Sequence, residues 1–319
     1  MGDTISSLLF QPPEPTRLKE SHVIFLDTKL GCRIPAFFIS NSAAALEDDD
    51  IDGGGPTLRS SKELTAACMT GGFGENCGTT LLYSHANAED LGNIYPWCKF
   101  LSKALKVNVL AYDYTGYGLA SGQGDPSEEN CFADIDAAYS YLRYQLQIPS
   151  HKIVLYGRSL GSGPSCYLAS RLSEPESEDN PVGGLILHAP FMSVFRIVLE
   201  SGCTLPGDKF PNCDFAPSIR SPVLVIHGTK DNIVPFRHGE QLISSVPEKF
   251  RAKPLFIDGM GHNNVGSAVR PMFVDGIRGY LKEHVDPSMN IPSGNMETPI
   301  KRKLKKRIVG RSPMKQQTI

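Results

Sequence analysis

Short, mainly apolar runs alternate with longer segments of helical periodicity along most of the chain. The runs are typical of strands buried on both faces of a sheet, and they cover residues 79–84, 107–112, 153–156, 222–228 and 253–257. Segments with an apolar residue every three or four positions lie between them, at 95–105, 132–146 and 160–172. Strand followed by helix at this spacing predicts an α/β fold, with a mostly parallel central sheet covered by helices on both faces.

The residues ahead of this alternating pattern differ in character. Two further apolar runs, 23–27 and 33–39, flank a short turn and predict an antiparallel hairpin within an N-terminal segment, residues 1–41. Residues 42–78 contain acidic and glycine clusters and follow neither a period of two nor one of 3.6. They predict a disordered surface insertion, after which the α/β core runs from 79 to 285.

The C-terminal residues 286–319 break from the globular pattern and predict a basic, flexible tail. Prolines precede the cationic run 301–307. Such a run is most often a solvated tail or a nuclear signal, and its functional interpretation is an anionic membrane surface. At the other end, Gly2 and Ser6 resemble a myristoylation signal, although Asp3 makes it a poor one. A lipid and a basic patch together predict peripheral attachment to the cytosolic leaflet.

The strongest chemical signal is the pentapeptide Gly157-Arg158-Ser159-Leu160-Gly161, which lies between a predicted strand and a predicted helix. In a nucleophile elbow the serine occupies a strained, sharp turn, and the positions two residues before and after it have no room for a side chain. The turn exposes the serine hydroxyl near a helix N-terminus, which favours developing negative charge. The spacing therefore predicts Ser159 as a nucleophile.

A serine nucleophile needs an acid and a histidine base, which follow it in that order in this type of fold, each just beyond a strand. Asp231 follows the run that ends at residue 228, and His262 follows the run that ends at residue 257. Asp258 is the main rival for the acid, but its place four residues before the histidine favours a loop-bracing role. The other histidines are interpreted as structural at strand ends (His188 and His227), out of order for a base (His85) or solvated (His22, His151, His238 and His284).

The loop after the run 79–84 is predicted to supply one of two oxyanion donors. Its small residues lie where hydrolases of this type bring a backbone N–H to the developing oxyanion. The donors would be the main-chain N–H groups of Asn87 and of Leu160, the residue after the nucleophile. The alternative is a tight strand-to-helix turn with a cap, and the loop alone does not separate the two.

Composition narrows the class of protein without indicating a substrate. With 319 residues, 40% hydrophobic and 21% charged, the chain can form one enzyme-sized domain. A net charge of −2 gives no indication of nucleic-acid binding. Eight cysteines without paired spacing, and no recognisable signal peptide, favour a cytoplasmic environment; no metal site or cofactor is predicted.

Long ordered stretches resemble the α/β-hydrolase domain-containing 17 branch of the serine hydrolases. The matching segments are Ser84–Gly92, Tyr112–Gly118, Ala133–Ala138, Tyr156–Gly161, Ile226–Asp231 and Gly261–Asn263. The resemblance implies the α/β-hydrolase fold and the triad Ser159, Asp231 and His262. It also implies activity on S-palmitoylated proteins at the cytosolic face of membranes.

This sequence departs from that branch in three places. The branch carries an N-terminal cluster of palmitoylated cysteines, whereas no cysteine precedes Cys32 here, which puts membrane recruitment by that route in doubt. The glycine after the oxyanion-loop histidine is replaced by Ala86, and the glutamine before the nucleophile by Arg158. Neither change removes a catalytic group, because the oxyanion donors are backbone amides.

The predicted function is hydrolysis of acyl thioesters or esters, with S-palmitoylated proteins as the preferred substrates. The connection between His188 and Pro222 is too short for a large cap, so the site should be shallow and suited to an acyl chain presented on a protein or a membrane. A carboxylesterase or serine peptidase with the same triad stays open. A non-catalytic binding module would be expected to lack a triad member, and none is missing.

Overall fold

The structure is a computed structural model that describes residues 9–16, 18–41, 57–74, 77–199 and 206–289. The described residues up to Ser288 form one compact unit. The basic run 301–307 and the lipidation signal at Gly2 lie outside the described residues, so both stay predictions.

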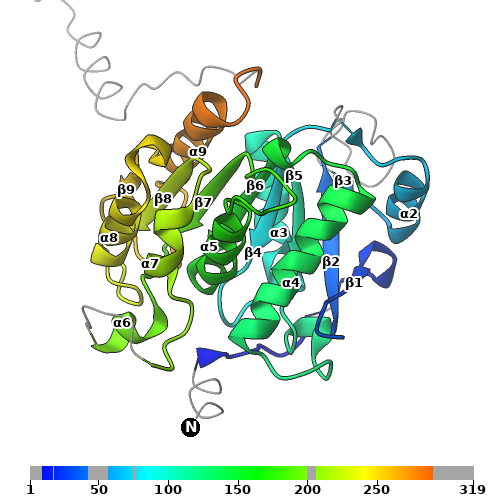
Figure 1. The fold of residues 1–319 in the computed structure, drawn as a ribbon, viewed down its shortest axis with the longest axis horizontal. Helices are drawn as coiled ribbons and strands as arrows, with labels where there is room; N and C mark the ends of the chain where they lie inside the picture. Colours follow the sequence, from blue (N-terminus) through cyan, green and yellow to red (C-terminus); the bar gives the residue numbers. More distant parts are fainter. Residues whose placement is uncertain (1–8, 17, 42–56, 75–76, 200–205, 290–319) are drawn as a thin grey trace, which may run out of the picture. The chain divides into compact units, whose positions relative to one another are not determined.

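One sheet runs through this unit, and its larger part is parallel, as the alternating pattern predicts (Figure 1). Within the described residues its strands are β1 (Ile24–Asp27), β2 (Arg33–Ser40), β3 (Thr57–Leu58), β4 (Thr80–Ser84), β5 (Asn108–Tyr112), β6 (Ile153–Arg158), β7 (Gly184–His188), β8 (Val223–Gly228) and β9 (Leu255–Ile257). Their order is β1-β2-β5-β4-β6-β7-β8-β9, with β3 paired to β2. The strands β5, β4, β6, β7, β8 and β9 pair in parallel, whereas β2 pairs antiparallel with β1, β3 and β5. The predicted entry hairpin is therefore confirmed as the pair β1–β2.

Helices cover both faces of the sheet, and Figure 1 shows α4 and α5 in front of the strands and α3 behind them. The α-helices are α2 (Ser61–Met69), α3 (Leu91–Leu105), α4 (Glu128–Ser140), α5 (Ser162–Arg171), α6 (Val194–Leu199), α7 (Asn212–Phe215), α8 (Arg237–Ser245) and α9 (Arg270–His284). A π-helical turn, Tyr141–Gln145, extends α4. The 3-10 turns are Glu20–His22, Gly118–Ala120, Ser150–Lys152, Ser159–Gly161, Ala216–Ser218 and Glu248–Phe250. Every residue of β4, β5, β7 and β8 is buried, which explains their apolar runs.

Helix α3 begins one turn earlier than the periodicity over 95–105 predicts. Asp90 caps it, because its carboxylate accepts the N–H of Asn93 at 3.0 Å while the Asn93 side chain accepts the N–H of Asp90 at 3.3 Å. This reciprocal cap satisfies two main-chain donors at the start of the helix. The helix therefore starts at Leu91, directly after the loop predicted to carry an oxyanion donor.

The prediction that all of residues 42–78 form a disordered insertion is wrong for its second half. Strand β3 adds to the sheet edge, and α2 opens with a capping box in which Ser60 accepts the N–H of Glu63 and Glu63 accepts the N–H of Ser60. Leu64 is 1% exposed, so the helix packs onto the core. Local capping and one buried leucine thus order a segment whose composition is polar. Residues 42–56 lie outside the described residues.

The connection from β7 to β8 determines how open the site is. Where the structure describes it, it contains only the short helices α6 and α7 with one 3-10 turn, in agreement with the predicted absence of a large cap. No helix within the described ranges has both the length and the apolar character needed to span a lipid bilayer.

Candidate active site

The predicted nucleophile turn has the geometry that its glycines require. Ser159 follows β6 and starts the 3-10 turn that leads into α5, with a φ of +49° in the left-handed region. A Cβ on Gly157 would lie 2.4 Å from the carbonyl oxygen of Gly161. A Cβ on Gly161 would lie 2.1 Å from the carbonyl oxygen of Ser84. Both glycines are therefore required for space, and the strained turn presents Ser159 at the carboxyl ends of the parallel strands.

Three predicted residues form a continuous line of hydrogen bonds. The Nε2 atom of His262 lies 2.9 Å from Ser159 Oγ, and its Nδ1 atom lies 2.7 Å from Asp231 Oδ2. A carboxylate only accepts, so Nδ1 carries the proton of the neutral imidazole and Nε2 is left to accept the serine hydroxyl. His262 is 6% exposed and Asp231 9% exposed. This is the arrangement that general-base activation of a serine requires.

Asp231 is held in its ionised form. Its Oδ1 atom accepts the main-chain N–H groups of Ile233 and Val234, both at 2.9 Å, and its Oδ2 atom lies 3.3 Å from His227 Nε2. Burial raises the pKa of Asp231, but hydrogen bonds from His227 and His262 outweigh burial and hold that pKa well below its ordinary value. An ionised Asp231 fixes the tautomer and orientation of His262.

The rival acid, Asp258, lies in the same loop as His262 but bonds to a different residue. Asp258 is exposed, and its Oδ1 atom accepts the hydroxyl of Thr229 at 2.9 Å. The structure therefore brings Asp231, and not Asp258, into contact with His262, as the sequence spacing favours.

One buried histidine agrees with its structural interpretation but also contacts the candidate triad, and another differs from its interpretation. His227 lies at the end of β8, and its Nε2 atom is 3.0 Å from the carbonyl oxygen of Val234. The same atom is 3.3 Å from Asp231 Oδ2, so His227 directly contacts the candidate acid. The prediction that His238 is solvated is wrong: it is 2% exposed, since it lies on the face of α8 that packs against β8. Burial and the charge of Arg237 lower the pKa of His238 to about 4, so it is uncharged at neutral pH.

The two predicted oxyanion donors lie on loops that touch each other at Gly161 and Ser84. The side chain of Asn87 is anchored by the hydroxyl of Tyr117, which donates to its Oδ1 atom at 2.7 Å, and by the carbonyl of Leu9, which accepts from its Nδ2 atom at 2.6 Å. Among the described residues, no hydrogen bond occupies the main-chain N–H of Asn87. Leu160 is in the first turn after Ser159, where main-chain N–H groups have no acceptor within the helix. Both residues stay predicted donors.

The sequence analysis missed a group of charged and polar residues around the hydrogen-bonded line from Ser159 to Asp231. Arg158 Nη1 pairs with Glu89 Oε1, and Arg158 Nη2 donates to Asn263 Oδ1 at 2.8 Å. These side chains border a hollow of about 220 Å³, together with Tyr83, Trp97 and His188. The only sequence signal was position, since Arg158 and Asn263 each adjoin a predicted triad residue.

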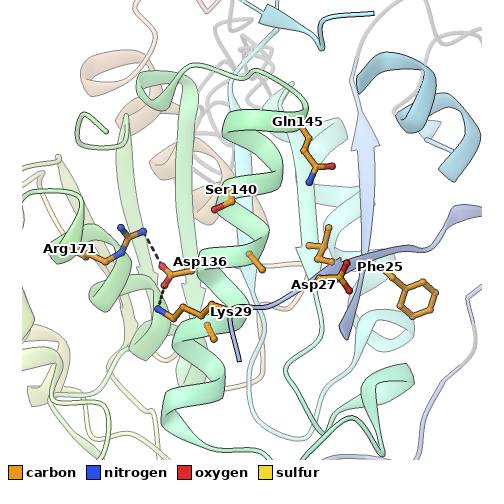
Figure 2. A pocket seen from close by; sticks show the side chains of 10 residues that line it. Phe25, Asp27, Lys29, Asp136, Ser140, Gln145 and Arg171 are labelled. Atoms are coloured by element: carbon orange, nitrogen blue, oxygen red, sulfur yellow. Dashed lines mark hydrogen bonds and ion pairs between the residues drawn. The ribbon is translucent and has the colours of Figure 1, made fainter. Parts of the chain in front are cut away.

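A larger hollow, of about 610 Å³, lies between β1 and α4 and involves no triad residue (Figure 2). Figure 2 shows Lys29 and Arg171 converging on Asp136, with N–O distances of 2.7 Å and 3.0 Å. Asp136 thus already pairs with both cations, and this hollow has no part in the candidate reaction. In the part of the chain that the structure describes, no three or more His, Cys, Asp or Glu side chains are grouped to hold a metal ion.

Comparison with known proteins first identifies the fold class. Residues 79–209 match the family model described as the alpha/beta hydrolase fold. An esterase from Pyrococcus furiosus has the same fold, with a TM-score of 0.60 and 14% identity over 86% of this chain and 98% of its own. Dipeptidyl peptidase 4 from Porphyromonas gingivalis aligns with a TM-score of 0.55 and 13% identity over 82% of this chain and 35% of its own. The chain has the α/β-hydrolase fold.

Curated relatives then give the family. Alpha/beta hydrolase domain-containing protein 17B of Homo sapiens is 36% identical over 269 residues, 83% of this chain and 86% of that protein. Alpha/beta hydrolase domain-containing protein aho-3 of Caenorhabditis elegans is 36% identical over 266 residues, 82% of this chain and 73% of that protein. This chain belongs to the α/β-hydrolase domain-containing protein 17 family, which confirms the resemblance inferred from its motifs.

Proposed function

We propose that this protein is a serine hydrolase that cleaves the acyl thioesters of S-palmitoylated proteins. The observation that carries the proposal is the hydrogen-bonded line from Ser159 through His262 to Asp231, with distances of 2.9 Å and 2.7 Å. Family membership supports hydrolysis as the class of reaction, and the sequence resemblance favours a fatty acyl group as the part transferred.

In this mechanism Ser159 Oγ attacks the carbonyl carbon of the thioester while His262 Nε2 takes the hydroxyl proton. Negative charge develops on the carbonyl oxygen, where the N–H groups of Asn87 and Leu160 would stabilise it. The carbon–sulfur bond then breaks, and His262 returns the proton to the departing cysteine sulfur. Water attacks the acyl-serine by the same route and releases the fatty acid and free Ser159.

The openness of the site supports a substrate that is presented on a larger surface. Ser159 is partly exposed, and only short helices lie between β7 and β8 in the described residues. An acyl chain attached to a protein at the cytosolic face of a membrane can approach such a site, whereas an enclosed pocket suits a small metabolite better.

Matched substrates test this proposal. A peptide carrying S-palmitoyl cysteine, its O-palmitoyl serine counterpart and a short-chain ester would be compared by release of free acid. We expect the highest kcat/KM for the thioester, and a loss of about 10³-fold or more with Ser159→Ala. The matched control is Ser244→Ala, which changes an exposed serine on α8 and should leave the rate unchanged.

Each of the other outcomes favours a different functional class. A preference for the short-chain ester favours a carboxylesterase, and cleavage of a peptide bond favours a peptidase. Substrate binding without turnover favours a binding module. Undiminished hydrolysis by Ser159→Ala contradicts a serine mechanism of this kind.

A further inference from the structure

We infer that Arg158 is a positioning residue that holds together the three loops carrying the candidate catalytic groups, an inference that rests on the proposed function. Arg158 is the last residue of β6 and directly precedes Ser159. Its guanidinium reaches two other loops, through Nη1 to Glu89 in the loop after β4 and through Nη2 to Asn263 in the loop after β9. Asn263 directly follows His262. One side chain thus joins the nucleophile, the base and the oxyanion loop.

The contact with Glu89 extends to the main chain of the oxyanion loop. Glu89 Oε1 pairs with Arg158, while Glu89 Oε2 accepts the N–H of Ala86 at 3.1 Å. Ala86 directly precedes Asn87, the predicted donor to the oxyanion. A change in the Arg158–Glu89 pair is therefore transmitted through two hydrogen bonds to the backbone beside that donor.

The chemistry of arginine suits this position. Its planar guanidinium presents five donors in a fixed geometry, so it binds two acceptors on different loops at once, whereas lysine carries a single mobile charge. The Arg158 side chain is 13% exposed and the Glu89 side chain 26% exposed. Removing one member of so sheltered a pair leaves the other charge poorly compensated, which favours displacement of its loop.

The expected effect falls on the chemical step. Oxyanion donors act on charge that exists mainly in the transition state, so their misplacement lowers kcat more than it raises KM. We expect Arg158→Met, which removes every donor at similar length, to lower kcat by about 10- to 100-fold, with KM changed less than about twofold. Glu89→Gln should act in the same direction. The double variant should be no worse than the more damaging single variant, because both changes break one pair.

The matched control is Arg143→Met, which breaks the partly buried pair between Arg143 and Asp179. Arg143 lies beside Ser150 and His151, which precede the start of β6. The control change should leave kcat unchanged, even if the melting temperature falls. Hydrogen–deuterium exchange supplies a readout that does not depend on turnover. Arg158→Met should speed exchange in peptides covering 85–90 and 261–264, and Arg143→Met should not.

Several results would overturn the role of Arg158. These are an unchanged kcat in folded Arg158→Met, a loss of kcat no larger than the loss of folded protein, or unchanged exchange in both loops. Failure of the proposed function is distinguishable, because wild-type protein would then not prefer the palmitoyl thioester, whereas the exchange experiment reports on the loops whatever the substrate. If hydrolysis depends on Ser159 but not on Arg158, the function stands and this inference falls.

Discussion

Of the two glycines that flank the candidate nucleophile, Gly161 leaves the least room for a side chain, and this gives a specific prediction. A methyl group added there would have its carbon 2.1 Å from the carbonyl oxygen of Ser84 and 2.9 Å from that of His85. Both acceptors are main-chain atoms at the end of β4, so no flexible side chain can move aside. Gly161→Ala must therefore separate the nucleophile turn from the oxyanion loop.

The size of the effect follows from that separation. Restoring an ordinary contact of 3.4 Å requires a movement of about 1.3 Å between the two segments. A misplacement of about 1 Å at a reacting centre costs on the order of 10²-fold in rate. Overpacking of this kind also costs about 1–3 kcal/mol of unfolding free energy. The assay is kcat/KM on a palmitoyl thioester, with urea unfolding measured on the same sample.

The same substitution at Gly279 is the matched control. Gly279 lies on the exposed side of α9, and a Cβ there meets no atom within 4 Å. Gly279→Ala should leave kcat/KM unchanged and stabilise the protein by about 0.5–1 kcal/mol. Near wild-type activity in folded Gly161→Ala would refute the reasoning, since the required displacement would then not affect the site.

Three further predictions concern acids and a helix cap. Asp231→Asn should reduce hydrolysis by about 10⁴-fold, because it favours the wrong tautomer of the base, whereas Asp258→Asn should have a mild effect; the reverse ranking would disprove the acid assignment. Burial raises the pKa of Asp134 to about 7, although hydrogen bonds from Thr115 oppose the shift. The folded state thus binds this proton more tightly than the unfolded state, and the contribution of Asp134 to stability falls as pH rises from about 4 to 7, by up to about 1.4 kcal/mol per pH unit. As pH rises over that window, Asp134→Asn should become more stable relative to wild type, as measured by urea unfolding. A difference in unfolding free energy that stays constant with pH would contradict the raised pKa of Asp134. Ser60→Ala should lower unfolding free energy by about 1 kcal/mol through loss of the α2 cap, measured by chemical denaturation; no change would mean that the cap does not stabilise the helix.

Local patterns were sufficient to predict the class of fold and the members of the candidate triad. The glycines at 157 and 161 encode a turn that few other sequences allow, and the strand-ending positions of Asp231 and His262 follow from runs only a few residues long. The missed helix α2 also had a local signal, because Ser60 and Glu63 have capping-box spacing. The acidic and glycine-rich composition of the surrounding segment obscured it.

Contacts between distant loops were beyond the reach of such patterns. Glu89 and Arg158 are 69 positions apart, and nothing in either neighbourhood indicates that their charges meet. The burial of His238 was missed for another reason: helix α8 was not predicted, and within it His238 shares the buried face with Leu242 and Ile243. The surroundings of the site therefore required the structure, whereas its central residues did not.

The central claim is that Ser159 is a nucleophile activated by His262, and covalent labelling tests it most directly. Purified protein would be treated with a fluorophosphonate probe, and the modified residue would be located by mass spectrometry. We predict a single adduct on Ser159 that forms in wild type, is absent in Ser159→Ala, and forms about 10³-fold more slowly in His262→Ala. An adduct on another residue, or equally rapid labelling of His262→Ala, would contradict the claim.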